Sequence, residues 1–215
     1  MILIGAGIET RLGAMEHDEG GMLRPPASLA QQGRLPGDIA RWRSEAAQIQ
    51  QDVLANGWDP VRKTFIQAYG GEDLDAAVLV IPSVRFLPRL DPRIRLTIDA
   101  VHRELNAGSD DLIFRYRGPD GLTGAEGAFV ICSFWLAQAH ALAGDFATGE
   151  ALFRKLLSRA TPLGLYGEQI DPATGDHLGN FPQGFSHAAV MTTALVLERL
   201  RPRRSAPVPA PDTEL

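Results

Sequence analysis

The stretch that decides the fold runs from Glu126 to Ala160 and reads EGAFVICSFWLAQAHALAG followed by DFATGEALFRKLLSRA. Its first part is apolar on nearly all sides, whereas its second part carries one apolar stripe and a charged opposite face. A helix that is apolar all round must be covered all round, and a striped helix shows one face to water. The pair therefore predicts a hairpin of a buried inner helix and a partly exposed outer helix.

The same order recurs on both sides of this stretch. Upstream, TFIQAYG (64–70) is a short extended piece, DLDAAVLVIPSVRFL (73–87) is apolar nearly all round, and DPRIRLTIDAVHREL (91–105) is striped. Downstream, LYGEQID (165–171) leads into the apolar run PQGFSHAAVMTTALVLERL (182–200). The apolar helices are expected to begin near residues 74, 126 and 182, which gives a repeat of structural type about every fifty residues. This alternation predicts an all-α toroid or solenoid arc of helical hairpins, with a simple helix bundle as the alternative.

The whole chain divides into three parts. Residues 1–33 are Gly-rich and irregular, residues 34–201 form the helical domain, and residues 202–215 read as a disordered, Pro-rich tail. The domain opens with PGDIARWRSEAAQIQQDVLANGW (36–58), whose apolar residues recur at three- and four-residue steps. This segment predicts an amphipathic helix that ends near Asn56 and Gly57.

Composition excludes several classes of function. The chain has 215 residues, of which 45% are hydrophobic and 22% charged. Its net charge of −5 does not indicate the positively charged surface that binding to nucleic acid needs. Glycines 5, 7 and 13 do not fit a dinucleotide-binding motif, and we expect neither a cofactor nor a metal ion. The single cysteine, Cys132, cannot form an internal disulfide. With no secretory signal and no membrane-length apolar run, the expected location is the cytoplasm, away from membranes.

Polar residues precede each apolar helix in the sequence. If the apolar helices form an inner ring, these polar residues meet at one opening of that ring. An opening lined by carboxylates, guanidinium groups, amides and aromatic rings suits a polyhydroxylated ligand such as a sugar. Each residue also has a structural interpretation: Asp75 favours a helix start, His187 suits a core position, and Arg115 and Arg117 suit a solvated strand edge. The candidate substrate-binding residues are Gln67, Asp75, Arg115, Arg117, Glu126, Gln183 and His187.

Several blocks of the sequence resemble one enzyme family. The segments PGDIARWRSEAAQIQQDVLANGWDP, TFIQAYGGEDLDAAVLVIP, FRYRGPDGLTGAEGAFVICSFWLAQAHALAGD and GLYGEQIDPATGDHLGNFPQGFSHAAV are similar to the C-terminal part of glycoside hydrolase family 15, which contains glucoamylases, glucodextranases and bacterial trehalases. The similarity covers roughly residues 35–200. It implies the C-terminal half of an (α/α)6 six-hairpin toroid, inverting hydrolysis of an α-glucoside or oligosaccharide, and a general base at Glu168.

Inversion needs a second carboxyl group as the acid. In the family this group lies in an upstream motif that the chain does not contain, and Glu9, Glu16, Asp18 and Glu19 lack its surroundings. We therefore expect a truncated chain that is inactive alone and associates with a missing N-terminal half or with itself. Two alternatives remain open: an inactive remnant or sugar-binding module, and a helical-repeat scaffold that binds a protein.

Overall fold

The computed structural model describes residues 16–17, 23–24, 36–118 and 126–202. Two short strands, β1 (Glu16–His17) and β2 (Leu23–Arg24), pair with each other in antiparallel orientation. The expectations for an irregular segment 1–33 and a disordered tail 202–215 fall almost entirely outside the described residues.

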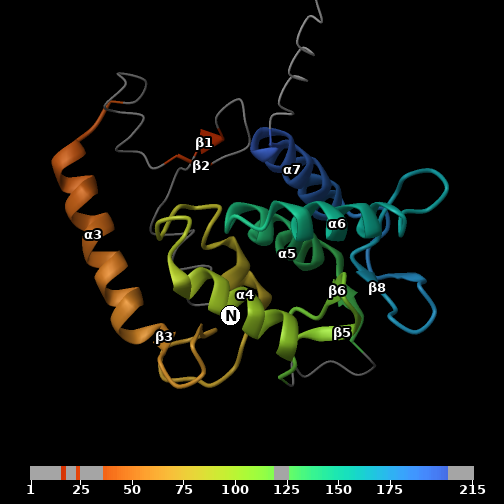
Figure 1. Ribbon diagram of the computed structural model, residues 1–215, viewed down its shortest axis with the longest axis horizontal. Coiled ribbons are helices and arrows are strands. Elements are labelled where there is room, and N and C mark those ends of the chain that lie inside the picture. The colour runs from red at the N-terminus through yellow and green to blue at the C-terminus, as the bar shows by residue number, and fades with distance from the viewer. Residues whose placement is uncertain (1–15, 18–22, 25–35, 119–125, 203–215) are drawn as a thin grey trace, which may run out of the picture.

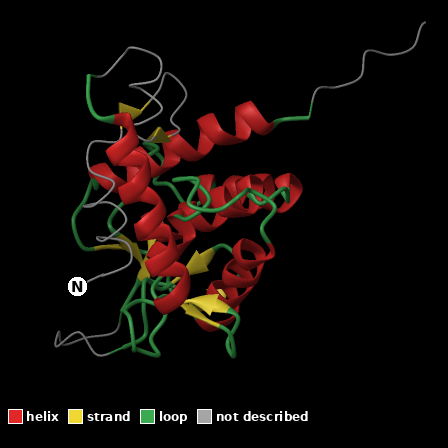
Figure 2. Ribbon diagram, turned by 90° about the vertical axis from the view of Figure 1, so that its left-hand side faces the viewer, coloured by secondary structure: helices red, strands yellow, loops and turns green. Residues whose placement is uncertain are grey.

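Helices are the main regular structure of the described residues, as the sequence predicts (Figure 1). The five α-helices are α3 (Ile39–Asn56), α4 (Pro92–Glu104), α5 (Val130–Leu142), α6 (Phe146–Leu157) and α7 (Gly184–Leu200). They begin within a few residues of the expected positions. In Figure 2, turned by 90°, α7, the α5–α6 pair and α4 lie in successive levels, with β1 and β2 near the top and other strands near the lower end.

The strands are short antiparallel pieces that precede the helices. β3 (Trp58–Asp59) pairs with β4 (Thr64–Phe65), and β5 (Asn106–Ser109) pairs with β6 (Leu112–Ile113). A three-stranded sheet has the order β7 (Ala128–Phe129), β8 (Gln169–Ile170) and β9 (His177–Leu178). This sheet joins the entrance of α5 to the loop before α7, two segments that are about forty residues apart in sequence.

The first apolar run does not form the long helix that its composition predicts. Only Ala76–Val80 is helical, as the 3-10 helix η1, and turns follow it. Ile81 still has helical dihedral angles, but Pro82 has no backbone N–H to donate, so the helical hydrogen-bond pattern is interrupted there. The run is buried nonetheless, because Val78, Leu79 and Ile81 belong to the core.

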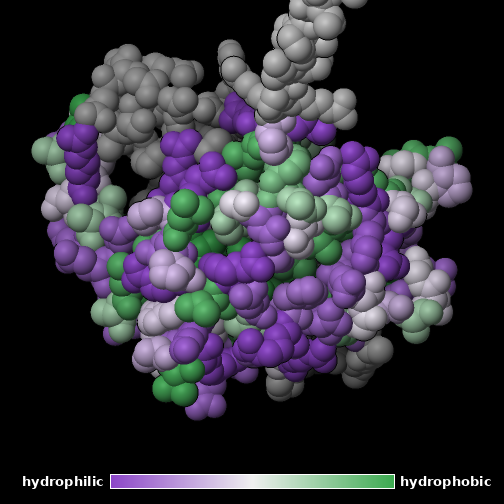
Figure 3. Space-filling view, viewed as in Figure 1, coloured by the Kyte–Doolittle hydropathy of each residue, from purple (hydrophilic) through white to green (hydrophobic). Residues whose placement is uncertain are grey.

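The inner and outer roles of α5 and α6 are as expected. Nearly every side chain of α5 is buried, whereas α6 buries Leu152 and Leu156 and exposes its charged face. The two helices approach closely at Gly149, where a Cβ atom would lie 2.6 Å from the carbonyl oxygen of Ala137. Figure 3 shows hydrophobic residues interleaved with hydrophilic ones over the face on which α4 and α6 lie.

The core is continuous across these elements. Its largest fully buried side chains include Phe65, Phe134 and Leu136, and Cys132 is also buried. Burial raises the pKa of the Cys132 thiol, which favours the neutral form of an inert core residue. Within the described chain, no helix is both long and apolar enough to cross a bilayer.

Asp145 ties the α5–α6 hairpin to α4. Its side chain accepts hydrogen bonds from the backbone N–H of Thr148 (3.3 Å) and from Arg95 (2.9 Å), and it lies 3.3 Å from Nδ1 of His140. Partial burial raises its pKa, but the hydrogen bonds from Arg95 and Thr148 outweigh burial and lower the pKa to about 2. The folded state therefore favours the ionised carboxylate.

We expect Asp145→Ala to lower the free energy of unfolding by about 2 kcal/mol at pH 7, because a pKa lowered from 3.8 to about 2 is a stability difference of this order. A depressed carboxylate pKa stabilises the fold above the unfolded value. The difference between parent and variant should therefore shrink as the pH falls from about 4 toward 2. Urea unfolding over this pH range measures it.

Asp99→Ala is the matched control for this prediction. Asp99 also pairs with Arg95, at 3.1 Å, but it is half exposed and caps no helix. An exposed pair of this kind contributes about 0–1 kcal/mol. Equal losses in the two variants, or a loss in Asp145→Ala that does not change with pH, would contradict the role given to Asp145.

Candidate functional site

The β7–β8–β9 sheet positions Glu168 at its edge. The backbone N–H of Glu168 donates to the carbonyl of Asn180 (3.0 Å), and the carbonyl of Glu168 accepts from Val130 N–H (3.1 Å), which extends the pairing by one residue. Its carboxylate oxygen Oε2 accepts from both the backbone N–H (3.2 Å) and the side-chain amide (2.9 Å) of Asn180. None of the described residues donates a hydrogen bond to Oε1. One carboxylate oxygen is thus fixed and the other is available.

Gly179 allows the chain to approach this carboxylate closely. Its φ of +72° is one that side chains with a Cβ rarely adopt, and a Cβ atom there would lie 2.8 Å from Oε2 of Glu168. Both the conformation and the close contact require glycine at this position.

We expect Gly179→Ala to displace the Glu168 carboxylate, and Gly175→Ala is the matched control. Gly175 also has a positive φ, of +81°, but a Cβ atom there would meet nothing within 4 Å. Each variant should lose about 1 kcal/mol of stability from the unfavourable backbone conformation. Only Gly179→Ala should also alter the Glu168 side chain, as measured by the side-chain signals of Glu168 in NMR spectra. Similar spectra for the two variants would contradict the packing.

A buried aromatic cluster supports the residues that precede Glu168. The Tyr166 hydroxyl donates to the carbonyl of Leu156 (2.9 Å), and its ring makes edge contacts with Phe134, His177 and His187. Burial raises the pKa of Tyr166 to about 12, so the hydroxyl remains a donor. These contacts anchor Tyr166, two residues before Glu168, to the core.

His177 holds the backbone next to the carboxylate. Its Nδ1 accepts from Gly167 N–H (3.1 Å), which assigns the proton to Nε2, and Nε2 donates to the carbonyl of Arg159 (3.1 Å). Ser186 donates to the carbonyl of Gly167 (2.8 Å) from the start of α7. Sequence reasoning missed His177 and Ser186 because both act on backbone atoms that no motif reveals.

Asp75 and Arg115 form a second group, beside β7. Asp75 is fully buried; its Oδ1 accepts from Ala77 N–H (2.7 Å) to start η1, and its Oδ2 lies 3.6 Å from Nε of Arg115. Burial, the largest influence, raises the pKa of Asp75, although Ala77 and Arg115 act in the opposite direction. The Arg115 guanidinium also lies over the ring of Phe129. The carboxyl thus starts η1 and faces Arg115, and a ligand contact by either residue stays a prediction.

Glu126 lies beside Gln169, the residue after the candidate base. Its carboxylate accepts from the side-chain amide N–H of Gln169 at 2.8 Å, and the side-chain oxygen Oε1 of Gln169 accepts from Gly127 N–H. Successive residues of an extended strand point to opposite faces. Glu126 therefore lies on the face of the sheet opposite to the Glu168 carboxylate.

Gln183 and His187 lie at the start of α7. Gln183 N–H donates to the carbonyl of Tyr166 (2.9 Å), and Nδ1 of His187 donates to the carbonyl of Gln183 (2.7 Å). Nε2 of His187 is buried and has no hydrogen-bond partner among the described residues. These contacts place both residues close to Tyr166 and hence to Glu168.

Arg117 and Gln67 are not joined to this group. The Arg117 guanidinium donates to the carbonyls of Glu104 and Asn106, each at 2.6 Å, and lies over the ring of Phe114. It therefore caps the end of α4, where a cation is favourable. Gln67 lies in the loop before η1, where its backbone N–H donates to Asp73. Among the described residues no contact links either one to Glu168, and their roles in substrate binding stay predictions.

Glu168 is not among the residues that line a pocket of about 510 Å³, whose lining includes Asp111, Lys155 and Arg159. Arg159 pairs with Asp111 (2.6 Å), and Lys155 pairs with Asp110 (3.2 Å), so both cations are neutralised. Over the part of the chain that the structure describes, no three His, Cys, Asp or Glu side chains are grouped to hold a metal ion.

Comparison with solved structures identifies the fold. The wild-type form of a glycosidase matches with a TM-score of 0.67 and 22% identity, over 83% of this chain and 49% of that chain. A variant glycosidase in complex with glucose matches with the same TM-score at 21% identity. The fold is therefore mostly helical and corresponds to half of a glycosidase of the six-hairpin toroid type.

Sequence comparison names the family. A sequence model of "Glycosyl hydrolases family 15" matches residues 23–195, and the chain belongs to that family. The match begins within the segment 1–33 that sequence analysis placed outside the family pattern. The chain is 48% identical to a trehalase of Mycolicibacterium smegmatis over 72% of its length, and 44% identical to a trehalase of Mycobacterium tuberculosis over 79%. It spans only 23% and 25% of those two relatives.

Proposed function

We propose that this chain is the C-terminal half of a six-hairpin toroid and supplies the general base, Glu168, of an inverting α-glucosidase of the trehalase type. The observation that carries the proposal is the Glu168 carboxylate itself. Asn180 fixes its Oε2 with two hydrogen bonds, whereas Oε1 has no donor among the described residues. A scaffold for protein binding has no need of a carboxylate held in this way.

The chemistry follows from the available oxygen. Oε1 of Glu168 takes a proton from a water molecule while the water oxygen attacks the anomeric carbon and the bond to the leaving sugar oxygen breaks. A second, protonated carboxyl gives its proton to that leaving oxygen. Because the water lies between the base and the sugar, the two carboxyl groups of an inverting enzyme are about 6.5–9.5 Å apart.

The second carboxyl is proposed to come from outside the described residues. Asp75 is fully buried, and Glu126 points to the other face of the sheet and is held by Gln169. Neither can face Glu168 across a sugar. Without a general acid the rate falls by about 10²–10⁴-fold, and half of the sugar contacts are missing as well. The isolated chain should therefore be nearly inactive.

The proposed substrate is an α-linked disaccharide of glucose, with trehalose first. Six similar proteins named as trehalases carry the matching segment, and one of the matching glycosidase structures holds glucose. Gln183 and His187 contact Tyr166, two residues before Glu168, and are the stronger candidates for contacts with sugar hydroxyls. The weaker candidates are Gln67, Arg115, Arg117 and Glu126.

The test is a fused enzyme, in which this chain replaces the segment of the M. smegmatis trehalase that it matches. The fused enzyme should hydrolyse trehalose, the isolated chain should show background rates, and the unaltered mycobacterial trehalase is the positive control. Glucose release measured with a coupled assay decides the outcome. A competent isolated chain would contradict the need for a second half, and a folded but inert fused enzyme would contradict the proposed function.

A further inference from the structure

Helix α7 has two apolar faces, and only one of them is buried. The buried face packs against α5 through Ala189, Val196 and Leu197, and Thr193 donates to the carbonyl of Phe134. On the other face, Phe185, Met191 and Leu195 are 71%, 60% and 46% exposed. Together with the exposed Ala188, these side chains recur at three- and four-residue steps, so they form one stripe, which we call the α7 stripe.

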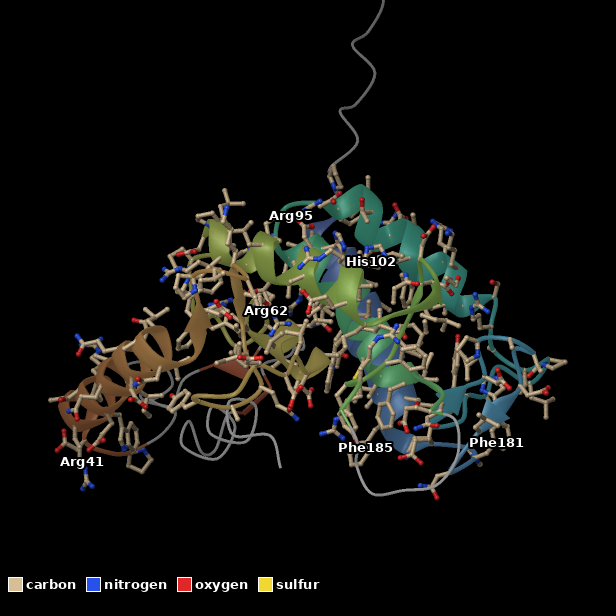
Figure 4. All side chains as sticks on the ribbon, turned by 90° about the horizontal axis from the view of Figure 1, so that it is seen from below. Arg41, Arg62, Arg95, His102, Phe181 and Phe185 are labelled. Carbon is tan, nitrogen blue, oxygen red and sulfur yellow. The ribbon has the colours of Figure 1, made fainter. Side chains whose placement is uncertain are left out.

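The α7 stripe lies at the margin of the described molecule. In Figures 1 and 2 helices α4, α5 and α6 lie on one side of α7. Figure 4 shows Phe185, with Phe181 from the preceding loop, on the side of the molecule away from Arg95 and His102 of α4. From Gly184 to Leu197 the helix carries no Asp, Glu, Lys or Arg, so no charge interrupts the stripe. A continuous exposed apolar surface of this kind marks an interaction site.

The matching structures indicate what covers the stripe. This chain accounts for 49% of the matching glycosidase chain at a TM-score of 0.67, so the fold continues for about the same length beyond the matched part. A helix that is apolar all round is covered all round in a complete fold. The stripe also begins at Phe185, between Gln183 and His187 at the entrance of α7, so whatever covers it approaches the Glu168 loop.

We propose that the α7 stripe is the docking surface for the remaining half of a family 15 fold, and that an apolar helix of that half packs along it. The proposal rests on the proposed function in one respect: docking there brings the second carboxyl to the sugar site beside Glu168. A second copy of this chain is the competing occupant, but a second copy would bring another base and no acid.

The experiment measures association of separate polypeptides. The probe is the M. smegmatis trehalase without the segment that this chain matches, co-expressed with the full 215-residue chain and captured through a tag. The variant is Met191→Glu with Leu195→Glu, and the control is Val61→Glu with Leu90→Glu, whose parent side chains are 88% and 80% exposed. Circular dichroism melts of the free chains confirm that the variants fold.

The parent and the control should bind the probe, and the α7 variant should bind at least about tenfold more weakly, because two buried charges would lack partners. Failure of the parent to bind, or equal binding by the α7 variant, would overturn the proposal. So would a parent dimer that the α7 substitutions dissociate and that excludes the probe. Binding without hydrolysis would count against the function alone, and hydrolysis by the fused enzyme without binding of the separate halves would count against the surface alone.

Discussion

Glu168→Gln in the fused enzyme should lower kcat for trehalose by about 10²–10⁴-fold, the range for loss of one positioned general base. The substitution keeps the shape of the side chain, and the amide oxygen can still accept the two hydrogen bonds from Asn180. It removes only the oxygen that takes the proton from water. KM should therefore change little, and steady-state kinetics separate the two effects.

Glu45→Gln is the matched control for this substitution. Glu45 lies on the exposed surface of α3, and the same chemical change there should leave kcat and KM unaltered. Glu168→Gln with normal turnover would show that Glu168 is not the base. A rise in KM with unchanged kcat would assign Glu168 to sugar binding instead.

Phe134→Ala should produce the largest loss of stability, about 3–5 kcal/mol, because removing a buried Phe side chain leaves a cavity. Phe134 is fully buried on α5, and its ring makes edge contacts with Phe153 of α6 and with Tyr166. The variant therefore loosens both the α5–α6 hairpin and the support of the Glu168 loop. Urea unfolding of the isolated chain measures the change.

Phe185→Ala is the control for that prediction, because it deletes the same side chain from an exposed position of α7. Its effect on the isolated chain should be within about 0.5 kcal/mol, as for other surface substitutions. A loss below about 1 kcal/mol for Phe134→Ala would be too small for a core residue, and it would contradict the packing of α5 at the centre of the fold.

Periodicity predicted the helices well where packing and local preference agree. The stripe of α4 and the all-round apolar character of α5 lead directly to their exposed and buried positions. The first apolar run does not form the helix that periodicity predicted, because burial alone does not make a helix. Leu74–Leu87 is as buried as α5, but Pro82 limits its helical part to η1.

The candidate site was predictable in position but not in detail. The polar residues before α5 and α7 do come together, because β7 pairs with β8. The separation of Arg117 from that group could not be read from the sequence, since its partners are backbone carbonyls of Glu104 and Asn106. The same holds for His177, whose two ring nitrogens contact the backbone of Gly167 and Arg159. Such contacts depend on where the chain folds back on itself.

The anomeric form of the glucose released from trehalose tests the central claim most directly. Trehalose joins two glucose units through α bonds at both anomeric carbons. A base at Glu168 that activates water inverts one of these carbons, so the fused enzyme should first release α- and β-glucose in equal amounts, as ¹H NMR spectra recorded before mutarotation would show. Release of α-glucose alone would mean retention of configuration, and it would contradict a general-base role for Glu168.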